Sequence, residues 1–406
     1  MDCPEGRPLR LLVLFIHNHL GGAMTALVNF VNALDPARYQ VDLLFYELKG
    51  QVEGIRPEVR ILPPACSRGH LLAKALSPAY LSNYLRAQYY LRAKGDRLLA
   101  RQLRAQQGCR FSRRLEGEYD LAVAFELAWP FYYMMGSVRA KRKLVWHHND
   151  YQAIGYRFDW DRPYFDRVDG LVFVSRECME KFTALHPGYR EKCFFMPNLM
   201  AAAPILARAA AGQPQLPFAL ARPGLNLVTV ARVSFASKGL DRMVGVLTRL
   251  REEGLLDRVR WLVIGGGHDL PRFRQMLAEN GLEGQVQAIG PRENPLPYLP
   301  AFDAFLLPSR NEGKPVAVTE AQILGLPPVV TRYTSASGQI EDGVDGFIFE
   351  NNDEALYQGL RELLLHPEKL AAARRAVQAR SYTNEQEIAR FHRIVRQVLG
   401  GGEGGG

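Results

Sequence analysis

Two glutamates, Glu312 and Glu320, have seven residues between them in the stretch SRNEGKPVAVTEAQILGLPPVV, residues 309–330. Glu312 lies among glycine, proline and polar residues that predict a turn, whereas Glu320 lies in an apolar segment with helical spacing. We expect a helix to begin near Val318 and to end at Gly325, which puts Glu320 in the first turn, where a carboxylate suits the helix dipole. The free N–H groups of that turn could hold a diphosphate. The two carboxylates could then accept hydrogen bonds from a ribose and from a sugar.

Two cations follow a predicted strand in the same half of the chain. Arg232 ends the apolar run LNLVTVAR, Lys238 lies in the loop after it, and a helix is expected beyond Gly239. Cations beside a helix start at the carboxyl end of a strand are typical of a phosphate site, although two unrelated surface cations would give the same pattern. The nearby VIGGGHD, residues 263–269, lacks the G-x-G-x-x-G fingerprint and so does not support a dinucleotide cofactor. These glycines fit a tight turn and a nucleotide contact equally well.

The elements that must position these residues read as alternating strands and helices. Short apolar runs without alternation predict strands covered on both faces, as in parallel sheets. We expect such strands at 10–16, 41–47, 120–126, 143–148 and 169–175, and again at 225–232, 258–267, 285–290, 304–309 and 327–331. Helical segments separate them, so the fold class is α/β with two Rossmann-like halves.

The domain boundaries follow from breaks in this rhythm. We expect an N-terminal domain over 1–200, an Ala- and Pro-rich linker over 201–224 and a C-terminal domain over 225–384. A helix at 385–399 could return to the N-terminal domain, and the glycine-rich tail at 400–406 should be disordered.

The stretch FDAFLLPSRNEGKPVAVTEAQILGLPPVVT, together with MPNL at 196–199 and VDGFIF at 344–349, resembles a known family. It is similar to the E-x7-E motif of retaining, nucleotide-sugar-dependent glycosyltransferases of the family-four type, the glycosyl transferases group 1. The resemblance covers residues 190–350 densely and residues 8–180 loosely. It implies the GT-B fold, in which two Rossmann-like domains face each other across a cleft. The N-terminal domain would then lie on the acceptor side, and the C-terminal domain would bind the nucleotide sugar.

The resemblance also assigns roles to single residues of the C-terminal domain. Glu312 and Gly313 would contact the donor sugar, and Glu320 would contact the nucleotide ribose. Arg232 and Lys238 would neutralise the departing diphosphate.

In the N-terminal half, the resemblance places Gly21 and Gly22 of HLGGAMT beside the donor phosphates. His148 of VWHHNDY would lie near the transferred sugar, because Asn149 and Asp150 follow it as in the family. His147 could take that place instead, but we favour a packing role for it at the end of a strand.

No cofactor or divalent metal is expected. Asp159-Trp160-Asp161 spells the D-x-D that binds metal in another glycosyltransferase fold, but it precedes Pro163 and predicts a surface loop. His17-x-His19 lacks an evident third ligand.

The implied activity is transfer of a sugar from a nucleotide diphosphate sugar to a hydroxyl of a glycan or lipid-linked acceptor, in cell-surface polysaccharide synthesis. A glycoside hydrolase or phosphorylase would also use paired carboxylates, yet a hydrolase needs no phosphate-binding cations. A non-enzymatic polyanion-binding protein would leave the second half unexplained. We therefore expect no nucleic-acid partner.

Composition and charge limit the cellular compartments in which the chain could act. The five cysteines are scattered without a C-x-x-C pair, which favours a reducing, cytoplasmic compartment over a disulfide scaffold. The net charge is +9, and residues 86–114 hold nine Arg or Lys and a single acid. Arg97, Arg101 and Arg104 recur there at helical spacing, which suits an anionic membrane surface as well as a solvated helix face. A peripheral position on the inner face of the plasma membrane is therefore an open expectation.

Overall fold

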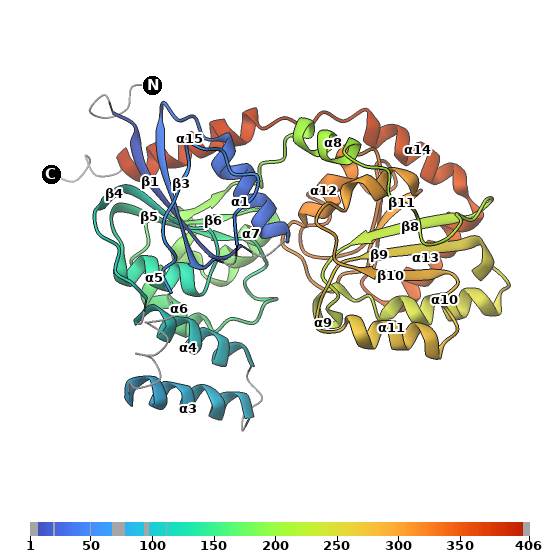
Figure 1. The fold of residues 1–406 in the computed structure, drawn as a ribbon, viewed down its shortest axis with the longest axis horizontal. Coiled ribbons are helices and arrows are strands. Elements are labelled where there is room, and N and C mark those ends of the chain that lie inside the picture. The colour runs from blue at the N-terminus through green and yellow to red at the C-terminus, as the bar shows by residue number, and fades with distance from the viewer. Residues whose placement is uncertain are drawn as a thin grey trace. The chain divides into compact units, whose positions relative to one another are not determined.

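The computed structural model describes residues 7–18, 21–48, 50–66, 78–92, 97–110 and 112–400, without the side chains of 79, 80, 83, 97, 98 and 110. Its contacts divide the chain into two compact units. The first unit runs to Leu199 and resumes at Glu385, and the second unit spans Met200–Asn384. Each unit has a parallel sheet with helices on both faces, as Figure 1 shows.

The first unit holds a seven-stranded parallel sheet in the order β3-β2-β1-β4-β5-β6-β7. Residues 11–15 of β1, residues 119–124 of β4 and all of β6 are buried, as the uninterrupted apolar runs predict. From β1 the chain runs outward through β2 to β3 and then returns to β4 on the other side of β1, so the switch point of the sheet lies between β1 and β4. The strands are β1 (Leu9–His17), β2 (Tyr39–Glu47), β3 (Arg60–Ile61), β4 (Glu118–Ala124), β5 (Arg139–His147), β6 (Gly170–Phe173) and β7 (Cys193–Phe195).

Helices cover this sheet, and the last of them comes from the C-terminal end of the chain. Phe391 of that helix packs edge-on against Phe30 at 5.0 Å between ring centroids. Arg142 of β5 donates a hydrogen bond to the carbonyl of Val398 at 2.7 Å. The helices are α1 (Gly22–Ala33), α3 (Pro78–Arg92), α4 (Arg97–Arg110), α5 (Trp129–Ser137), α6 (Phe158–Phe165), α7 (Arg176–Leu185), the 3-10 helix at Pro187–Lys192 and α15 (Glu385–Gly400).

The second unit holds a six-stranded parallel sheet in the order β10-β9-β8-β11-β12-β13, with its switch point between β8 and β11. The strands are β8 (Leu225–Val230), β9 (Val259–Ile264), β10 (Val286–Gly290), β11 (Ala304–Leu307), β12 (Pro328–Thr331) and β13 (Phe347–Phe349). The helices are α8 (Ala202–Ala210), α9 (Phe235–Lys238), α10 (Arg242–Glu252), α11 (Leu270–Glu279), α12 (Val316–Ile323), α13 (Asp353–Leu365) and α14 (Pro367–Gln378), with 3-10 helices at Leu256–Arg258 and Leu296–Ala301.

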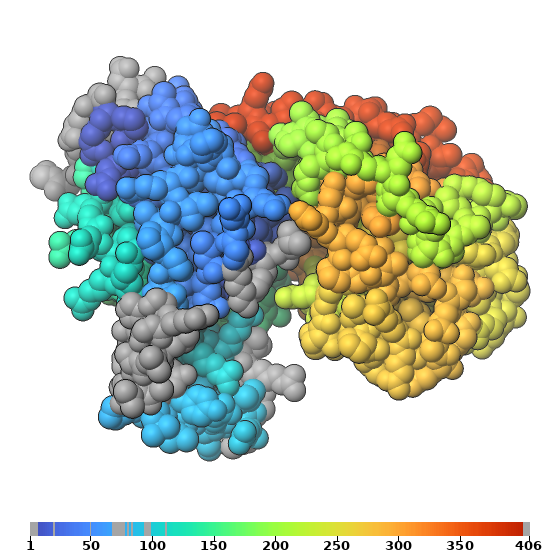
Figure 2. Space-filling model, viewed as in Figure 1, coloured from blue at the N-terminus to red at the C-terminus, as the bar shows by residue number. Residues whose placement is uncertain are grey.

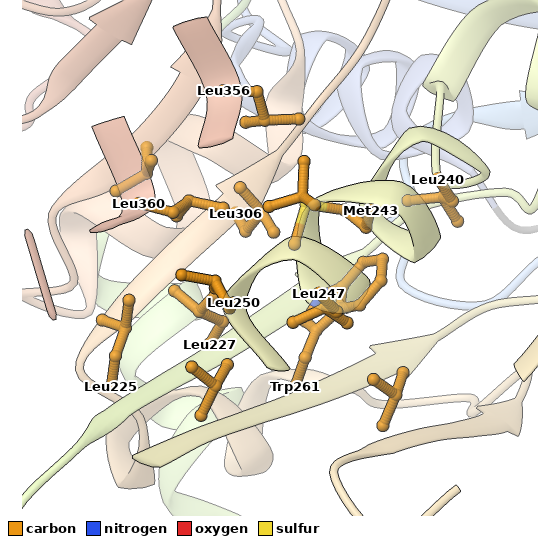
Figure 3. Packing of buried hydrophobic residues seen from close by; sticks show 14 of the residues in the cluster. Leu225, Leu227, Leu240, Met243, Leu247, Leu250, Trp261, Leu306, Leu356 and Leu360 are labelled. Carbon is orange, nitrogen blue, oxygen red and sulfur yellow. The ribbon is translucent and has the colours of Figure 1, made fainter. Parts of the chain in front are cut away.

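The core of the second unit forms where α10 lies on the sheet. Met243, Leu247 and Leu250 recur at helical spacing on its apolar face and pack over Leu227 and Trp261 of β8 and β9 (Figure 3). All five side chains are buried. This packing fixes the start of α10, and with it the loop after β8, relative to the sheet.

Two stretches differ from the sequence-based expectation. The 201–224 segment is more than a linker, because it includes α8, whose Ile205 is buried, and it belongs to the second unit. The basic stretch forms two helices, α3 and α4, rather than one. The predicted disordered tail lies, except for Gly400, outside the described residues. None of the helices in the described part of the chain combines the length and the apolar character that a bilayer span needs.

Candidate active site

The predicted site residues of the second unit follow the two strands at its switch point. Arg232 and Lys238 come after β8, and Glu312 comes after β11, which pairs with β8. The carboxyl ends of parallel strands lie at one edge of the sheet, and ligands of open α/β sheets bind at that edge beside the switch point. The fold therefore brings these three residues to one place.

Lys238 and Glu312 form an ion pair. Their side chains are only 19% and 7% exposed, so the pair is largely shielded from water. Ser309 donates a second hydrogen bond to the same oxygen of Glu312 at 2.7 Å. The charge of Lys238 is thus balanced by Glu312. The sequence analysis gave these two residues separate roles and did not predict this pair.

The loop that carries Lys238 lies directly on the loop that carries Glu312. Gly239 has φ of +61°, and a Cβ there would lie 2.4 Å from the carbonyl oxygen of Pro308. The Arg310 amide donates to the Ser237 carbonyl at 2.8 Å. Only glycine permits both this conformation and this close approach, which explains its position next to Lys238.

Arg310, which the sequence analysis missed, ties the two loops together. Its guanidinium donates two parallel hydrogen bonds to the Asp241 carboxylate at 2.9 and 3.0 Å, and a third to the Phe235 carbonyl at 2.6 Å. Such a bidentate pair fixes geometry as well as charge. Arg310 is the first residue of the predicted turn RNEGKP, but nothing in the sequence identifies Asp241 as its partner.

Arg232 is the exposed cation of this site. Within the described part of the chain, its side chain forms no ion pair or hydrogen bond that would balance the charge. The loop around it rests on the glycines of VIGGGHD. A Cβ at Gly265 or Gly267 would lie 1.9 Å from the Ala231 oxygen and 2.1 Å from the Val233 oxygen. Close backbone approach therefore explains these two glycines without any nucleotide contact.

Glu320 lies in the second turn of α12, which corrects the expectation of a first-turn position. The helix begins at Val316, and Pro315 precedes it with φ of −66°, the value that proline imposes. Gln339 holds this helix start by donating hydrogen bonds to the Pro315 carbonyl at 3.0 Å and to the Thr319 hydroxyl at 2.8 Å. A helix-capping role therefore does not explain Glu320.

The Glu320 carboxyl is buried, and it forms no hydrogen bond or ion pair with the described residues. Burial raises its pKa, and the Arg208 charge on α8 acts in the opposite direction. A buried carboxyl without a partner costs folding free energy, which a ligand that donates hydrogen bonds to it would recover.

In the first unit, His148 follows β5 and lies against Phe125, the residue that follows β4, with 4.7 Å between the ring centroids. Its Nε2 is buried without a hydrogen-bond partner among the described residues. Burial lowers the pKa of His148 to about 4, although a hydrogen bond to the Phe125 backbone raises it in part. The imidazole is therefore neutral at pH 7, and Nε2 could serve one polar group of a ligand.

His147 has a different environment. Its ring is buried and stacks on Phe173 at 4.5 Å, with Tyr151, Phe165 and Phe182 around it. Burial, with a smaller effect of the His148 charge, lowers the pKa of His147 to about 3. These surroundings agree with a packing role.

Gly21 and Gly22 lie at the start of α1, on the same sheet edge. The Gly21 carbonyl accepts the Thr25 amide at 3.0 Å, and the space where a Gly21 Cβ would stand is open for at least 4 Å. A ligand could therefore approach this backbone. His17 ends β1, whereas His19 lies outside the described residues.

The D-x-D at 159–161 lies within α6, not on a surface loop as expected. Asp161 is buried and accepts hydrogen bonds from the hydroxyls of Tyr132 and Tyr151 and from the Gln102 amide at 3.1 Å. This carboxylate is satisfied by the protein. In the part of the chain that the structure describes, no three His, Cys, Asp or Glu side chains are grouped as metal ligands would be.

Glu126 is a carboxylate that the sequence analysis passed over. It follows β4 at the switch point of the first unit, and nearby Ala128 has φ of +67°, which is unusual for a residue with a side chain. Burial raises the pKa of Glu126 to about 7, with Arg101 opposing the effect. Strained backbone and a perturbed carboxyl at a strand end are typical of functional sites.

Comparison with known proteins agrees with this geometry. Residues 218–380 match the sequence model of the family Glycosyl transferases group 1. The amylovoran biosynthesis glycosyltransferase AmsK of Erwinia amylovora is 32% identical over 149 residues, which are 35% of this chain and 35% of AmsK. A UDP-Gal:alpha-D-GlcNAc-diphosphoundecaprenol alpha-1,3-galactosyltransferase of Escherichia coli is 32% identical over 105 residues, 25% of this chain and 27% of the enzyme. The alignments thus span about a third of these relatives or less.

The solved structures extend the similarity to the whole fold. Anabaena HepE, crystallised with UDP-glucose, superposes with a TM-score of 0.67 at 16% identity and covers 97% of this chain and 99% of HepE. The second unit thus matches the glycosyl transferases group 1 family over residues 218–380, and the chain has the GT-B fold with its two Rossmann-like units.

Proposed function

We propose that this chain is a glycosyltransferase that moves a sugar from a nucleotide diphosphate sugar to a hydroxyl of a glycan or lipid-linked acceptor, with retention of the anomeric configuration. The main support is the family match over the second unit, together with a sheet edge that gathers Arg232, Lys238, Glu312 and the helix carrying Glu320. AmsK acts in amylovoran biosynthesis, and the Escherichia coli relative is named for a diphosphoundecaprenol-linked acceptor. These names favour a role in cell-surface polysaccharide synthesis.

In this proposal, different residues of the second unit contact different parts of the donor. Glu320 accepts hydrogen bonds from the ribose hydroxyls, since its carboxyl is buried without a protein partner. Glu312 and Gly313 receive the sugar hydroxyls. Arg232 neutralises the diphosphate as it leaves, because its charge is not already balanced by a carboxylate of the described chain.

Lys238 has a second task in this proposal. Its ion pair with Glu312, together with the hydrogen bond from Ser309, fixes the direction of that carboxylate. As negative charge grows on the departing phosphate, the Lys238 ammonium can be shared with it, which stabilises the transition state more than the ground state. No protein nucleophile is needed when the departing phosphate oxygen takes the acceptor proton.

The residues of the first unit keep the roles that the family resemblance implies. His148 would offer its neutral imidazole to a hydroxyl of the transferred sugar. The open backbone at Gly21, next to Gly22 at the start of α1, would admit phosphate oxygens.

A panel of nucleoside diphosphates and their sugars, followed by thermal unfolding, tests the donor assignment. A ligand at about 100 times its dissociation constant should stabilise the folded state by roughly 2.7 kcal/mol. Uridine compounds are the first choice because HepE was crystallised with UDP-glucose. The proposal fails if neither the diphosphates nor the sugars raise the melting temperature.

The proposal also includes transfer without a divalent metal, because Arg232, Lys238 and the start of α12 can supply the positive charge. Activity should survive EDTA. If EDTA abolished transfer and Mn²⁺ or Mg²⁺ restored it, this assignment of charge would be wrong.

A glycoside hydrolase or phosphorylase is the competing proposal, since each also uses carboxylates. A transferase releases a nucleoside diphosphate only in step with a glycosylated acceptor. A hydrolase or phosphorylase would instead act on a glycan without any nucleotide, so a glycan-only incubation separates them.

A further inference from the structure

Helix α3 exposes a row of large apolar side chains. Leu81 is 57% exposed, Tyr84 41%, Leu85 58% and Tyr89 53%. Their spacing of three, four and eight positions from Leu81 places them on one face of the helix. Exposed apolar residues that stand singly are ordinary, whereas these four are grouped on one face of one helix. We call these four residues the α3 stripe.

The opposite side of α3 is already occupied. Ala87, Tyr90 and Leu91 pack against a small cluster on α4 that includes Leu99 and Leu103. Figure 1 shows α3 beyond α4, on the side away from the sheet, and Figure 2 shows residues 78–92 as a ridge on the surface of the first unit. The stripe is therefore the face that α3 turns outward.

Specific contacts hold this helix pair on the rest of the first unit. Gln102 of α4 donates to Asp161 at 3.1 Å and accepts the Arg157 amide at 2.9 Å. The Arg86 guanidinium of α3 lies 5.1 Å from the ring centroid of Trp160. The stripe is thus presented by a helix that the fold holds in place.

The charge of the two helices limits what can cover the stripe. Neither α3 nor α4 contains an acidic residue. Arg92, Arg101 and Arg104 are exposed on them. A helix with an apolar face, tyrosines and flanking arginines suits the interface of a bilayer with anionic headgroups, where the apolar face enters the acyl boundary.

The size of the stripe argues against a protein partner. One face of a 15-residue helix is roughly 22 Å long and about 10 Å wide, or roughly 220 Å². A stable protein–protein interface needs about 800 Å² from each partner. A bilayer has no such requirement, because lipids surround each inserted side chain.

We propose that the α3 stripe docks the first unit on an anionic lipid bilayer, with the arginines of α3 and α4 at the level of the headgroups. The docking lies on the surface and does not cross the bilayer. It is independent of the proposed sugar chemistry, which it would serve by keeping the chain at a membrane that holds lipid-linked acceptors.

Co-sedimentation of the full chain with vesicles tests this proposal. The parent should bind vesicles of phosphatidylcholine mixed with phosphatidylglycerol, and bind pure phosphatidylcholine more weakly. The triple variant Leu81→Gln/Leu85→Gln/Tyr89→Gln should lose at least about tenfold in partitioning. A matched triple variant, Leu185→Gln/Leu206→Gln/Leu365→Gln, removes three other exposed leucines and should bind like the parent.

A charge variant separates lipid docking from nonspecific adhesion. Arg92→Gln/Arg104→Gln should weaken binding to the anionic vesicles by about thirtyfold at low ionic strength, since each cation contributes about 1 kcal/mol near such a surface. Circular dichroism and the response of the melting temperature to UDP should stay unchanged in all variants. A failure of UDP binding would thus concern the proposed function, not the docking.

Three results would overturn the proposal. The parent could fail to bind anionic vesicles, or the stripe variant could bind as well as the parent. Light scattering could also find a dimer that the stripe variant converts to a monomer, which would make this face an interface between copies of the chain.

Discussion

Replacing Lys238 with methionine should destabilise the second unit markedly, because it removes the partner of a shielded carboxylate. Glu312 is only 7% exposed and would keep one hydrogen bond, from Ser309 at 2.7 Å. Breaking a buried ion pair from one side costs about 3–5 kcal/mol, since the remaining charge stays out of water. Lys238 is itself 19% exposed, so we expect the lower value, about 3 kcal/mol.

Thermal unfolding followed by circular dichroism measures this loss. For a unit of this length, 1 kcal/mol moves the melting temperature by about 2–4 °C, so Lys238→Met should lower the second unit's transition by about 6–12 °C. Lys369→Met is the matched control. Lys369 pairs with Glu362 at 2.6 Å, but both side chains are 47% exposed, so its loss should leave the transition almost unchanged.

The double variant Lys238→Met/Glu312→Gln completes the test, because it removes the stranded charge. Its transition should recover most of what Lys238→Met loses. Equal shifts in Lys238→Met and Lys369→Met, or no recovery in the double variant, would refute the inference that this pair is energetically buried.

Three further outcomes follow from the two sites. Arg232→Ala should reduce turnover roughly a hundredfold and lower the free energy of unfolding by less than about 0.5 kcal/mol. The control Arg272→Ala, which removes an exposed arginine of α11, should change neither turnover nor stability. A wild-type rate in Arg232→Ala would contradict its role at the diphosphate. Glu320→Gln should weaken nucleoside diphosphate binding about tenfold or more in calorimetry without lowering the melting temperature. Glu312→Gln should weaken binding of the donor sugar more than binding of the nucleotide. Unchanged nucleotide affinity in Glu320→Gln would show that Glu320 does not contact the ribose. Glu126 has a folded-state pKa of about 7, above its ordinary value of 4.5, so the folded chain holds this proton more tightly than the unfolded chain does. The contribution of Glu126 to the free energy of unfolding is therefore fully present below pH 4.5. About 3 kcal/mol of it is lost as the pH rises through 7. Arg101 and Tyr156 are the neighbouring charged and titratable groups. Glu126→Gln should flatten this decline in the first unit's melting temperature, whereas Glu180→Gln on the exposed surface of α7 should not; identical pH profiles would show that Glu126 is not perturbed.

The strands were the most predictable part of this fold. All ten predicted strands are present, because most of them contain a run of consecutive buried apolar residues that is visible in the sequence. The three that were missed, β3, β7 and β13, have two or three residues each. Runs that short carry too little apolar pattern to be separated from loops.

The start of α12 shows how a local signal can be overlooked. Pro315 fixes its own φ near the helical value and favours a helix that begins just after it, as the structure shows at Val316. The apolar pattern alone pointed to Val318. The difference moves Glu320 from the first turn to the second and removes helix capping as an explanation for its carboxylate.

The pairing of Lys238 with Glu312 could not be predicted, because the two residues lie 74 positions apart. Each was assigned to the donor by its position after a strand, and the shared switch point brings them to one edge. Which cation meets which carboxylate depends on loop conformations that Gly239 and Arg310 set, through contacts with Pro308 and Asp241.

The D-x-D at 159–161 failed as a surface prediction for a similar reason. Asp161 is buried because Tyr132 and Tyr151 offer hydroxyl groups to it, and neither tyrosine is distinguished in the sequence from any other core aromatic residue.

The linker prediction failed at Ile205, whose burial anchors α8 to the second unit. Alanine- and proline-rich composition did not reveal that contact.

The most direct test of the central claim is an incubation of the purified chain with UDP-glucose, and with other nucleotide sugars in parallel, in the presence of a lipid-linked glycan acceptor. Nucleoside diphosphate and glycosylated product are measured together by mass spectrometry. We expect the two to appear in equal amounts, with both strongly reduced in Glu320→Gln. Release of free sugar without a glycosylated acceptor, or turnover of a glycan when no nucleotide sugar is present, would contradict the account.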